Sequence, residues 1–110
     1  METVLVMEAV EKHGEVMRQH LEQQGFKVVL SDTAEHAKAL IQKESPNILV
    51  VDLNIANETF TDFYQWILDN ESTTLLPRLF IAGKMQHNIA QKLEKEHKET
   101  ILLKPLDIKR

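Results

Sequence analysis

Short apolar runs alternate with amphipathic segments along the whole chain. Two of the runs, at residues 48–51 and 101–103, contain no polar residue, which is typical of strands covered on both faces of a parallel sheet. Three similar runs occupy residues 4–7, 26–30 and 79–82. The segments between the runs carry apolar residues at helical spacing. Five strands alternating with four helices predict a doubly wound α/β domain.

The helix with the clearest pattern is predicted over residues 60–68. Apolar side chains recur there at positions i, i+3, i+4, i+7 and i+8, so all of them share one face. The residues of this stripe are Phe60, Phe63, Tyr64, Ile67 and Leu68. The fourth predicted helix, around Ile89 and Leu93, is mostly polar, so we expect it to be solvated.

The first two helices carry weaker patterns. In the first, Val16, His20 and Leu21 mark one face, and Gly25 supplies a stop. For the second, the sequence Asp-Thr-Ala-Glu at residues 32–35 predicts a capping box at its start. The apolar stripe of this second helix consists of Ala34, Ala37, Leu40 and Ile41.

Composition narrows the class of protein. The chain has 110 residues, which predicts one domain with a single core. It has no cysteine, which excludes disulfides and thiolate sites and fits a reducing compartment. There is no signal-peptide pattern, and no apolar run approaches the roughly 20 residues of a membrane helix, so we expect a cytoplasmic protein without a membrane partner. The net charge is −4 with scattered basic residues, so we expect no direct binding of nucleic acid.

Two predicted strands end on residues of opposite charge. Asp52 follows the third strand, and Lys104-Pro105 follows the fifth. In open parallel sheets, ligands and chemistry collect at the carboxyl ends of the strands. The carboxylate and the ammonium group are therefore candidates for one shared site.

With these residues, the chain resembles the receiver domain of bacterial response regulators, the phosphoacceptor half of two-component signalling, over essentially its whole length. In that family the first strand ends in an acidic pair, the third on the phosphorylated aspartate, the fourth on Thr or Ser, and the fifth on Lys-Pro. Residues 8–9, Asp52, Ala82 and Lys104-Pro105 stand at these positions here. The intervals match those of the family, with 30 positions from Asp52 to Ala82 and 22 from Ala82 to Lys104.

The resemblance implies a flavodoxin-like receiver fold with a five-stranded parallel sheet of order 2-1-3-4-5. The family has a fifth helix after the last strand, whereas only residues 106–110 follow Pro105. Apolar area left open costs about 25 cal/mol per Å², which adds up to a large share of a small domain's stability. We therefore expect residues 1–110 to be a receiver-like domain excised from a longer chain, or a partner to cover the gap.

The resemblance makes Asp52 the phosphoacceptor. A carboxylate that attacks a phosphoryl group must be ionised, and a divalent cation and an ammonium group can offset the incoming negative charge. Lys104 is expected to pair with Asp52 at rest and with a phosphoryl oxygen afterwards; the alternative is a structural ion pair at the sheet edge. Both interpretations place the two side chains close together. The bond before Pro105 is a candidate for the family's often cis peptide.

The metal site departs from the family pattern at Ala9. Mg²⁺ prefers near-octahedral oxygen ligands, which the family supplies from the second acidic residue, the phosphoacceptor and a backbone carbonyl two residues beyond it. The candidate ligands here are Glu8, Asp52 and the backbone carbonyl of Asn54. We expect Mg²⁺ binding to be weak or absent. Without a metal, Glu8 beside Asp52 is a like charge that raises a pKa, partly offset by Lys104.

Two switch positions are degenerate as well. Ala82 lacks the hydroxyl that hydrogen-bonds the phosphoryl group in the family, an interaction of about 1.5–3 kcal/mol. Ile101 stands where the family usually carries a Tyr or Phe that swings inward with that hydroxyl. The usual two-state coupling is therefore expected to be absent or rebuilt.

Two functions from different classes follow. In the first, Asp52 accepts a phosphoryl group from a histidine kinase or phosphotransfer protein and passes the signal to an attached or separate output domain. Such a domain is no enzyme beyond self-catalysed phosphoryl transfer, and a homodimer is a candidate assembly. In the second, the chain is a pseudo-receiver, a protein-binding module that acts without phosphorylation. Asp52 and Lys104 favour the first, whereas Ala9, Ala82 and Ile101 favour the second.

Overall fold

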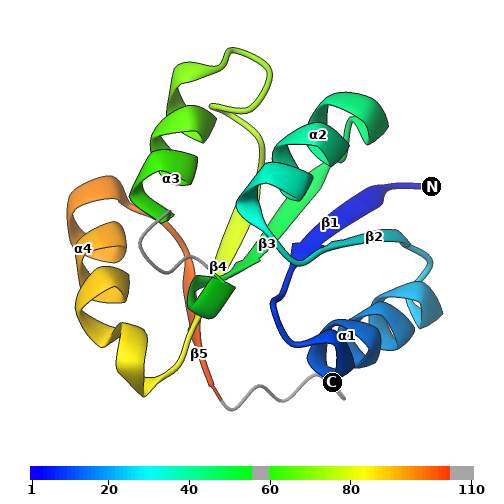
Figure 1. Ribbon diagram of the computed structural model, residues 1–110, viewed down its shortest axis with the longest axis horizontal. Helices are drawn as coiled ribbons and strands as arrows, with labels where there is room; N and C mark the ends of the chain where they lie inside the picture. The colour runs from blue at the N-terminus through cyan, green and yellow to red at the C-terminus, as the bar shows by residue number, and fades with distance from the viewer. Residues whose placement is uncertain (56–59, 105–110) are drawn as a thin grey trace.

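The computed structural model describes residues 1–55 and 60–104 of the chain, apart from the side chain of residue 55. Its regular elements alternate as the apolar pattern predicts (Figure 1). In chain order they are β1 (Thr3–Met7), α1 (Glu11–Gln23), β2 (Lys27–Ser31), α2 (Ala34–Glu44), β3 (Ile48–Asp52), the 3₁₀ turn η1 (Leu53–Ile55), α3 (Phe60–Asp69), β4 (Arg78–Ala82), the 3₁₀ turn η3 (Lys84–Gln86), α4 (His87–His97) and β5 (Ile101–Leu103).

The five strands form one parallel sheet in the order β2-β1-β3-β4-β5. This is the strand order that the resemblance implied, so the prediction of a doubly wound, flavodoxin-like sheet is confirmed. The register pairs Met7 with Val51, Asp52 with Ile81, and Ala82 with Leu103. The carboxyl ends of the three central strands and β5 therefore meet at one edge of the sheet.

Helices cover both faces of this sheet. Successive strand residues point to opposite faces, so each strand contributes to two separate cores. The larger core packs under α2, α3 and α4, and the smaller one packs under α1 (Figure 1). In β1, for example, Leu5 belongs to the first core and Val6 to the second, and both are buried.

Strand β5 is the least covered strand. The side chain of Leu102, opposite Ile81 of β4, is 42% exposed, and that of Leu103 is 62% exposed. In the part of the chain that the structure describes, α1 alone packs on the smaller core. No helix among the described residues is long and apolar enough to cross a membrane.

The inner face of α1 differs from the prediction. Val16 is 47% exposed, whereas Met17 and Leu21 pack on the smaller core and Gly14 is buried. Residues 14, 17 and 21 are spaced i, i+3 and i+7, so they share one face. Of the predicted face, Leu21 therefore packs inward as expected, whereas Met17 takes the inward position in place of Val16. The predicted stop is confirmed, since Gly25 has a φ of +96°.

The start of α2 also differs from the prediction. The N-cap is Thr33, whose side chain accepts a hydrogen bond from the amide of His36 at 3.1 Å. The predicted box ran from Asp32 to Glu35, one residue too early. Asp32 instead leaves its side chain 73% exposed, 3.6 Å from Nδ1 of His36. The predicted stripe of this helix is confirmed, because Ala37 and Ile41 are buried and the other two members pack against the larger core.

The remaining helices follow their patterns closely. In α3, the residues at 60, 63, 64 and 67 are buried. In α4, Ala90 and Leu93 are buried, whereas Ile89 is 39% exposed. The rest of α4 is mostly exposed, which agrees with the solvated helix that the sequence predicted.

Candidate functional site

The centre of the candidate site is the carboxylate of Asp52. It ends β3, whose other residues are apolar, and it is only 2% exposed. The chain turns into η1 directly after it, and this turn brings the amide of Asn54 back to donate to Oδ1 of Asp52 at 2.8 Å. A buried strand therefore carries one charged group to the edge of the sheet, and the following turn holds it there.

Lys104 supplies the opposite charge. Its amide donates to the carbonyl of Ala82 at 2.9 Å, which continues the pairing of β4 and β5 by one residue. Its Nζ lies 2.8 Å from Oδ2 of Asp52, so the expected proximity of the two side chains is observed. Oδ2 is buried and lies in ion-pair contact with this ammonium group, which can occupy no more than part of its acceptor capacity. One buried carboxylate oxygen thus keeps spare acceptor capacity.

Glu8 is the second acid of the site. It follows β1 and is 6% exposed, with its amide donating to the carbonyl of Ser31 at 2.9 Å. Its Oε1 accepts from the amide of Val10 at 3.1 Å and lies 3.6 Å from Nδ1 of His13. Burial, followed by the neighbouring Asp52, raises the pKa of Glu8 from 4.5 to about 7.

The pKa of Asp52 moves in the opposite direction. Burial by itself would raise it, but Glu8, Lys104 and the amide of Asn54 favour the ionised form and together hold the pKa of Asp52 below its usual range. Of the two acids, Glu8 is therefore the one that keeps its proton to the higher pH. Asp52 is left ionised beside an ammonium group, which is the state that a carboxylate nucleophile requires.

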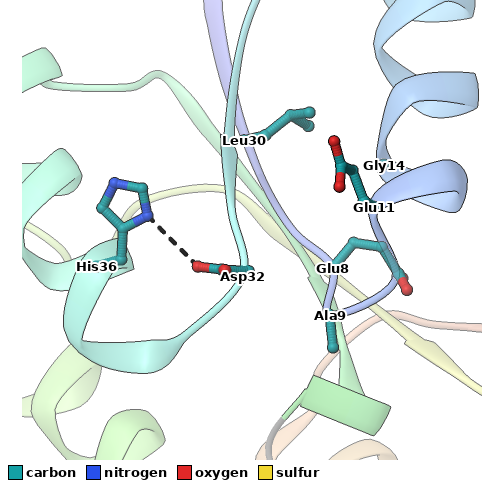
Figure 2. Close-up of a pocket in the computed structure, with 7 residues that line it drawn as sticks. All are labelled: Glu8, Ala9, Glu11, Gly14, Leu30, Asp32 and His36. Carbon is teal, nitrogen blue, oxygen red and sulfur yellow. Dashed lines mark ion pairs between the residues drawn. The ribbon is translucent and has the colours of Figure 1, made fainter.

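Ala9 contributes no ligand to the site. It lines an open cleft of about 280 Å³ between the end of β1, the start of α1 and the start of α2. Figure 2 shows Glu8, Ala9 and Glu11 on one side of this cleft, and Asp32 turned toward His36 on the other. Among the described residues, no group of three or more His, Asp or Glu side chains is arranged to hold a metal ion. Two adjacent carboxylates, Glu8 and Asp52, are what remains for a divalent cation.

The two switch positions are apolar in the structure as in the sequence. Ala82 is fully buried and belongs to the larger core. Ile101 pairs with Phe80 and packs against the same core while half-buried. Neither side chain can form a hydrogen bond to a group on Asp52. The candidate cis peptide before Pro105 lies outside the described residues.

Sequence reasoning missed one residue that reaches the site. Gln86 accepts a hydrogen bond from the amide of Gly83 through Oε1 at 2.9 Å, and its Nε2 lies 3.3 Å from Oδ1 of Asn54. The only signal in the sequence is the spacing, since a Gln three residues after the first residue of a helical turn is one half of a capping box. Nothing in the sequence indicates the contact with Asn54.

Comparison with known proteins identifies the family. The family model described as the response regulator receiver domain matches residues 4–110. The chain belongs to this family. Receiver domains are signalling modules of two-component systems rather than classical enzymes. No curated protein matches the chain.

Solved receiver structures share the fold at low sequence identity. A response regulator receiver domain protein from Clostridium thermocellum has a TM-score of 0.84 at 16% identity, covering 98% of this chain and 86% of its own. The chemotaxis response regulator CheY4 of Vibrio cholerae has a TM-score of 0.82 at 18% identity, with 98% and 90% covered. The non-phosphorylated HemR receiver domain from Leptospira biflexa has a TM-score of 0.79 at 24% identity, with 99% and 86% covered. At these identities the likeness extends to the fold alone.

Proposed function

We propose that this receiver domain accepts a phosphoryl group on Asp52 from a histidine kinase or phosphotransfer protein and passes the signal to an output domain or partner. The observation that carries the proposal is the contact of 2.8 Å between Lys104 Nζ and Oδ2 of Asp52, a carboxylate that is 2% exposed at the carboxyl end of β3. A buried acid that stays ionised beside an ammonium group is suited to attack an electrophilic phosphorus.

The transfer itself is a simple displacement. A bond forms between a carboxylate oxygen of Asp52 and the phosphorus, while the bond from phosphorus to the donor's histidine nitrogen breaks and its electron pair stays on the imidazole. Lys104 offsets the charge that collects on the phosphoryl oxygens, and it can move from the carboxylate to one of them, since its side chain is 35% exposed and long. The amide of Asn54 holds Oδ1 in place during this exchange.

The residues fit a divalent cation, although Ala9 removes one of the oxygen ligands that the family supplies. Glu8 and Asp52 offer adjacent hard oxygen ligands, and Oδ2 of Asp52, in contact with the Lys104 ammonium group, keeps acceptor capacity for a cation. With the backbone carbonyl of Asn54 they would hold Mg²⁺, and Ala9 leaves a position for water. When bound, the ion would offset phosphoryl charge. We expect this site to be weak because only two carboxylates contribute to it.

Phosphorylation is tested by incubating the domain with Mg²⁺ and acetyl phosphate and recording its intact mass. We expect a gain of about 80 Da, the mass of one phosphoryl group, in the native chain and none in Asp52→Asn. A matched control is Asp69→Asn, which changes an exposed carboxylate at the end of α3 and should leave the gain intact. Absence of any gain in the native chain, at every donor concentration, would refute the proposal.

The alternative is a pseudo-receiver that binds its partner without phosphorylation. The observation in its favour is the apolar character of Ala82, fully buried where the family places a hydroxyl, together with Ala9 in the acidic cleft. This alternative predicts that Asp52→Asn binds partners and supports signalling as the native chain does. The pseudo-receiver would be excluded if Asp52→Asn lost signalling and only the phosphorylated native chain bound the partner.

A further inference from the structure

A chain of polar contacts leads from Asp52 to the start of α4. The amide of Asn54 donates to Oδ1 of Asp52 at 2.8 Å. The side-chain oxygen of Asn54 then lies 3.3 Å from Nε2 of Gln86, and the side-chain oxygen of Gln86 accepts from the amide of Gly83 at 2.9 Å. One side chain, that of Gln86, thus contacts both the turn that follows the phosphoacceptor and the turn that follows β4.

The two ends of the Gln86 amide have different tasks. Its oxygen can only accept and its nitrogen can only donate, so the contact with Gly83 and the contact with Asn54 need opposite ends of the group. The oxygen accepts from the amide of Gly83, the N-cap of the η3 turn, from which α4 continues at His87. The nitrogen is left for Asn54. The cap and the bridge are therefore separable by substitution.

The backbone at Gly83 is closely enclosed by this arrangement. A Cβ atom at this position would lie 3.3 Å from the Gln86 side-chain oxygen and 3.7 Å from Cδ of Lys104. The first distance is a tight one for a Cβ atom, so a larger residue here would make the Gln86 side chain shift slightly. The turn after β4 is thus held between Gln86 and the stem of Lys104, the residue that faces Asp52.

This chain of contacts matters because the residue at position 82 is a buried alanine. Its methyl group cannot bind a group on Asp52, so the end of β4 has no side chain of its own through which to follow the state of the site. Gln86 lies four residues later, contacts the turn that holds Asp52, and caps the turn that begins α4. A change in what the Asn54 amide binds can therefore reach α4 through a single side chain.

We propose that Gln86 is a positioning residue that couples Asp52 to α4 in place of a hydroxyl at position 82. The proposal rests on the proposed function for its trigger, the phosphoryl group on Asp52. That group changes the acceptor available to the amide of Asn54, the η1 turn shifts, and the bond from Asn54 to Gln86 carries the shift to Gly83 and the first turn of α4.

The test separates the two tasks of Gln86 with the variant Gln86→Glu. This variant keeps an acceptor for the amide of Gly83 but loses the donor for Oδ1 of Asn54. Because a flipped Asn54 amide can donate to the new carboxylate, Asn54→Ala is added, which removes the bridge and leaves the Gln86 cap intact. Each protein is treated with acetyl phosphate and Mg²⁺, its intact mass is recorded, and amide hydrogen exchange is followed over residues 83–90. Gln91→Glu, on the exposed side of α4, is the matched control.

We expect the native chain, Gln86→Glu and Gln91→Glu all to gain about 80 Da. Exchange over residues 83–90 should change on phosphorylation in the native chain and in Gln91→Glu by roughly two- to ten-fold, the factor that one hydrogen bond provides. It should not change in Gln86→Glu. It should not change in Asn54→Ala either, and a change there equal to that of the native chain would overturn the proposal.

The coupling through Gln86 can be tested even if the domain is not phosphorylated. If no protein takes up a phosphoryl group, Asp52→Ala replaces the trigger, because it removes the acceptor of the Asn54 amide. This substitution should alter exchange over residues 83–90 when Gln86 is present and leave it unchanged in the double variant with Gln86→Glu. Identical responses in the two backgrounds would overturn the coupling, whatever the outcome with acetyl phosphate.

Discussion

At the scale of single residues, Glu8 and Asp52 share one buried site but hold their protons differently. Burial and then the neighbouring Asp52 raise the pKa of Glu8 to about 7. The pKa of Asp52 stays low although burial opposes it, because Glu8, Lys104 and the Asn54 amide favour its charge. Two carboxylic acids in one site thus differ in their protonation, Glu8 holding its proton more tightly and Asp52 favouring the ionised form.

This division predicts a dependence of stability on pH. Glu8 has the ordinary pKa of 4.5 in the unfolded chain and about 7 in the folded one. Protonation of Glu8 therefore stabilises the native state relative to the unfolded state. The gain is fully present below about pH 4.5 and is lost as the pH rises through about 7. We expect Glu8→Gln to match the native chain near pH 4.5 and to be more stable by on the order of 2–3 kcal/mol at pH 8.

Urea unfolding at the two pH values measures this difference. The matched control is Glu11→Gln, at the exposed start of α1. It should cause the same small change in the free energy of unfolding at both pH values. A Glu8→Gln variant whose stability relative to the native chain is the same at pH 4.5 and pH 8 would contradict the raised pKa.

At the scale of elements, α2 shows how one side chain sets the start of a helix. Thr33 has extended backbone angles, its oxygen accepts from the amide of His36, and its carbonyl accepts from the hydroxyl of Ser31 at 2.8 Å. Two neighbours therefore hold Thr33 at the boundary between β2 and α2. Asp32, one residue earlier, makes only an exposed contact with His36.

The position of this cap is tested by two adjacent substitutions. Thr33→Ala should destabilise the fold by about 1 kcal/mol, since it removes the acceptor of a helix amide. Asp32→Ala should change the free energy of unfolding by less than about 0.5 kcal/mol, because an exposed pair contributes little. Chemical unfolding of both variants decides between the observed cap and one at Asp32. A larger cost for Asp32→Ala would place the cap at Asp32.

At the scale of the whole molecule, the two ends of the sheet serve different purposes. The carboxyl ends of the strands gather Asp52 and Lys104. At the amino end of β4, Arg78 donates to both oxygens of Glu99 at 2.8–3.1 Å, and the hydroxyl of Tyr64 donates to the same carboxylate at 2.5 Å. Burial and the contact with Glu99 raise the pKa of Tyr64 to about 12. This cluster ties α3, β4 and the turn before β5 together, away from the site.

Removing one partner of this cluster should lower the free energy of unfolding. In Glu99→Ala, the Arg78 side chain, which is 13% exposed, would remain without its carboxylate, so we expect a loss of about 3–5 kcal/mol. Tyr64→Phe removes one hydrogen bond and should cost about 1 kcal/mol. The control Glu96→Ala, on the exposed face of α4, should cost less than about 0.5 kcal/mol. Thermal or urea unfolding measures all three, and similar values for Glu99→Ala and Glu96→Ala would contradict the role of the cluster.

Much of the fold could be predicted from the sequence because its signals are local. An apolar run indicates a strand wherever the strand lies in the sheet, and the stripe from Phe60 to Leu68 indicates a helix by spacing alone. The order of the strands came from the resemblance. The meeting of Asp52 and Lys104, 52 positions apart, could also be predicted, since the carboxyl ends of all strands in a parallel sheet lie at one edge.

Only the tertiary structure decided the features that depend on what packs against what. Met17 rather than Val16 faces the smaller core, because the rotation of α1 is set by the strands beneath it. The pKa of Glu8 reflects burial that several elements create together. The bridge from Asn54 to Gln86 joins residues 32 positions apart through side chains alone. The sequence by itself therefore determined the elements and the charged residues at their ends, and the packing between elements decided which other side chains meet them, because such contacts leave no periodic pattern along the chain.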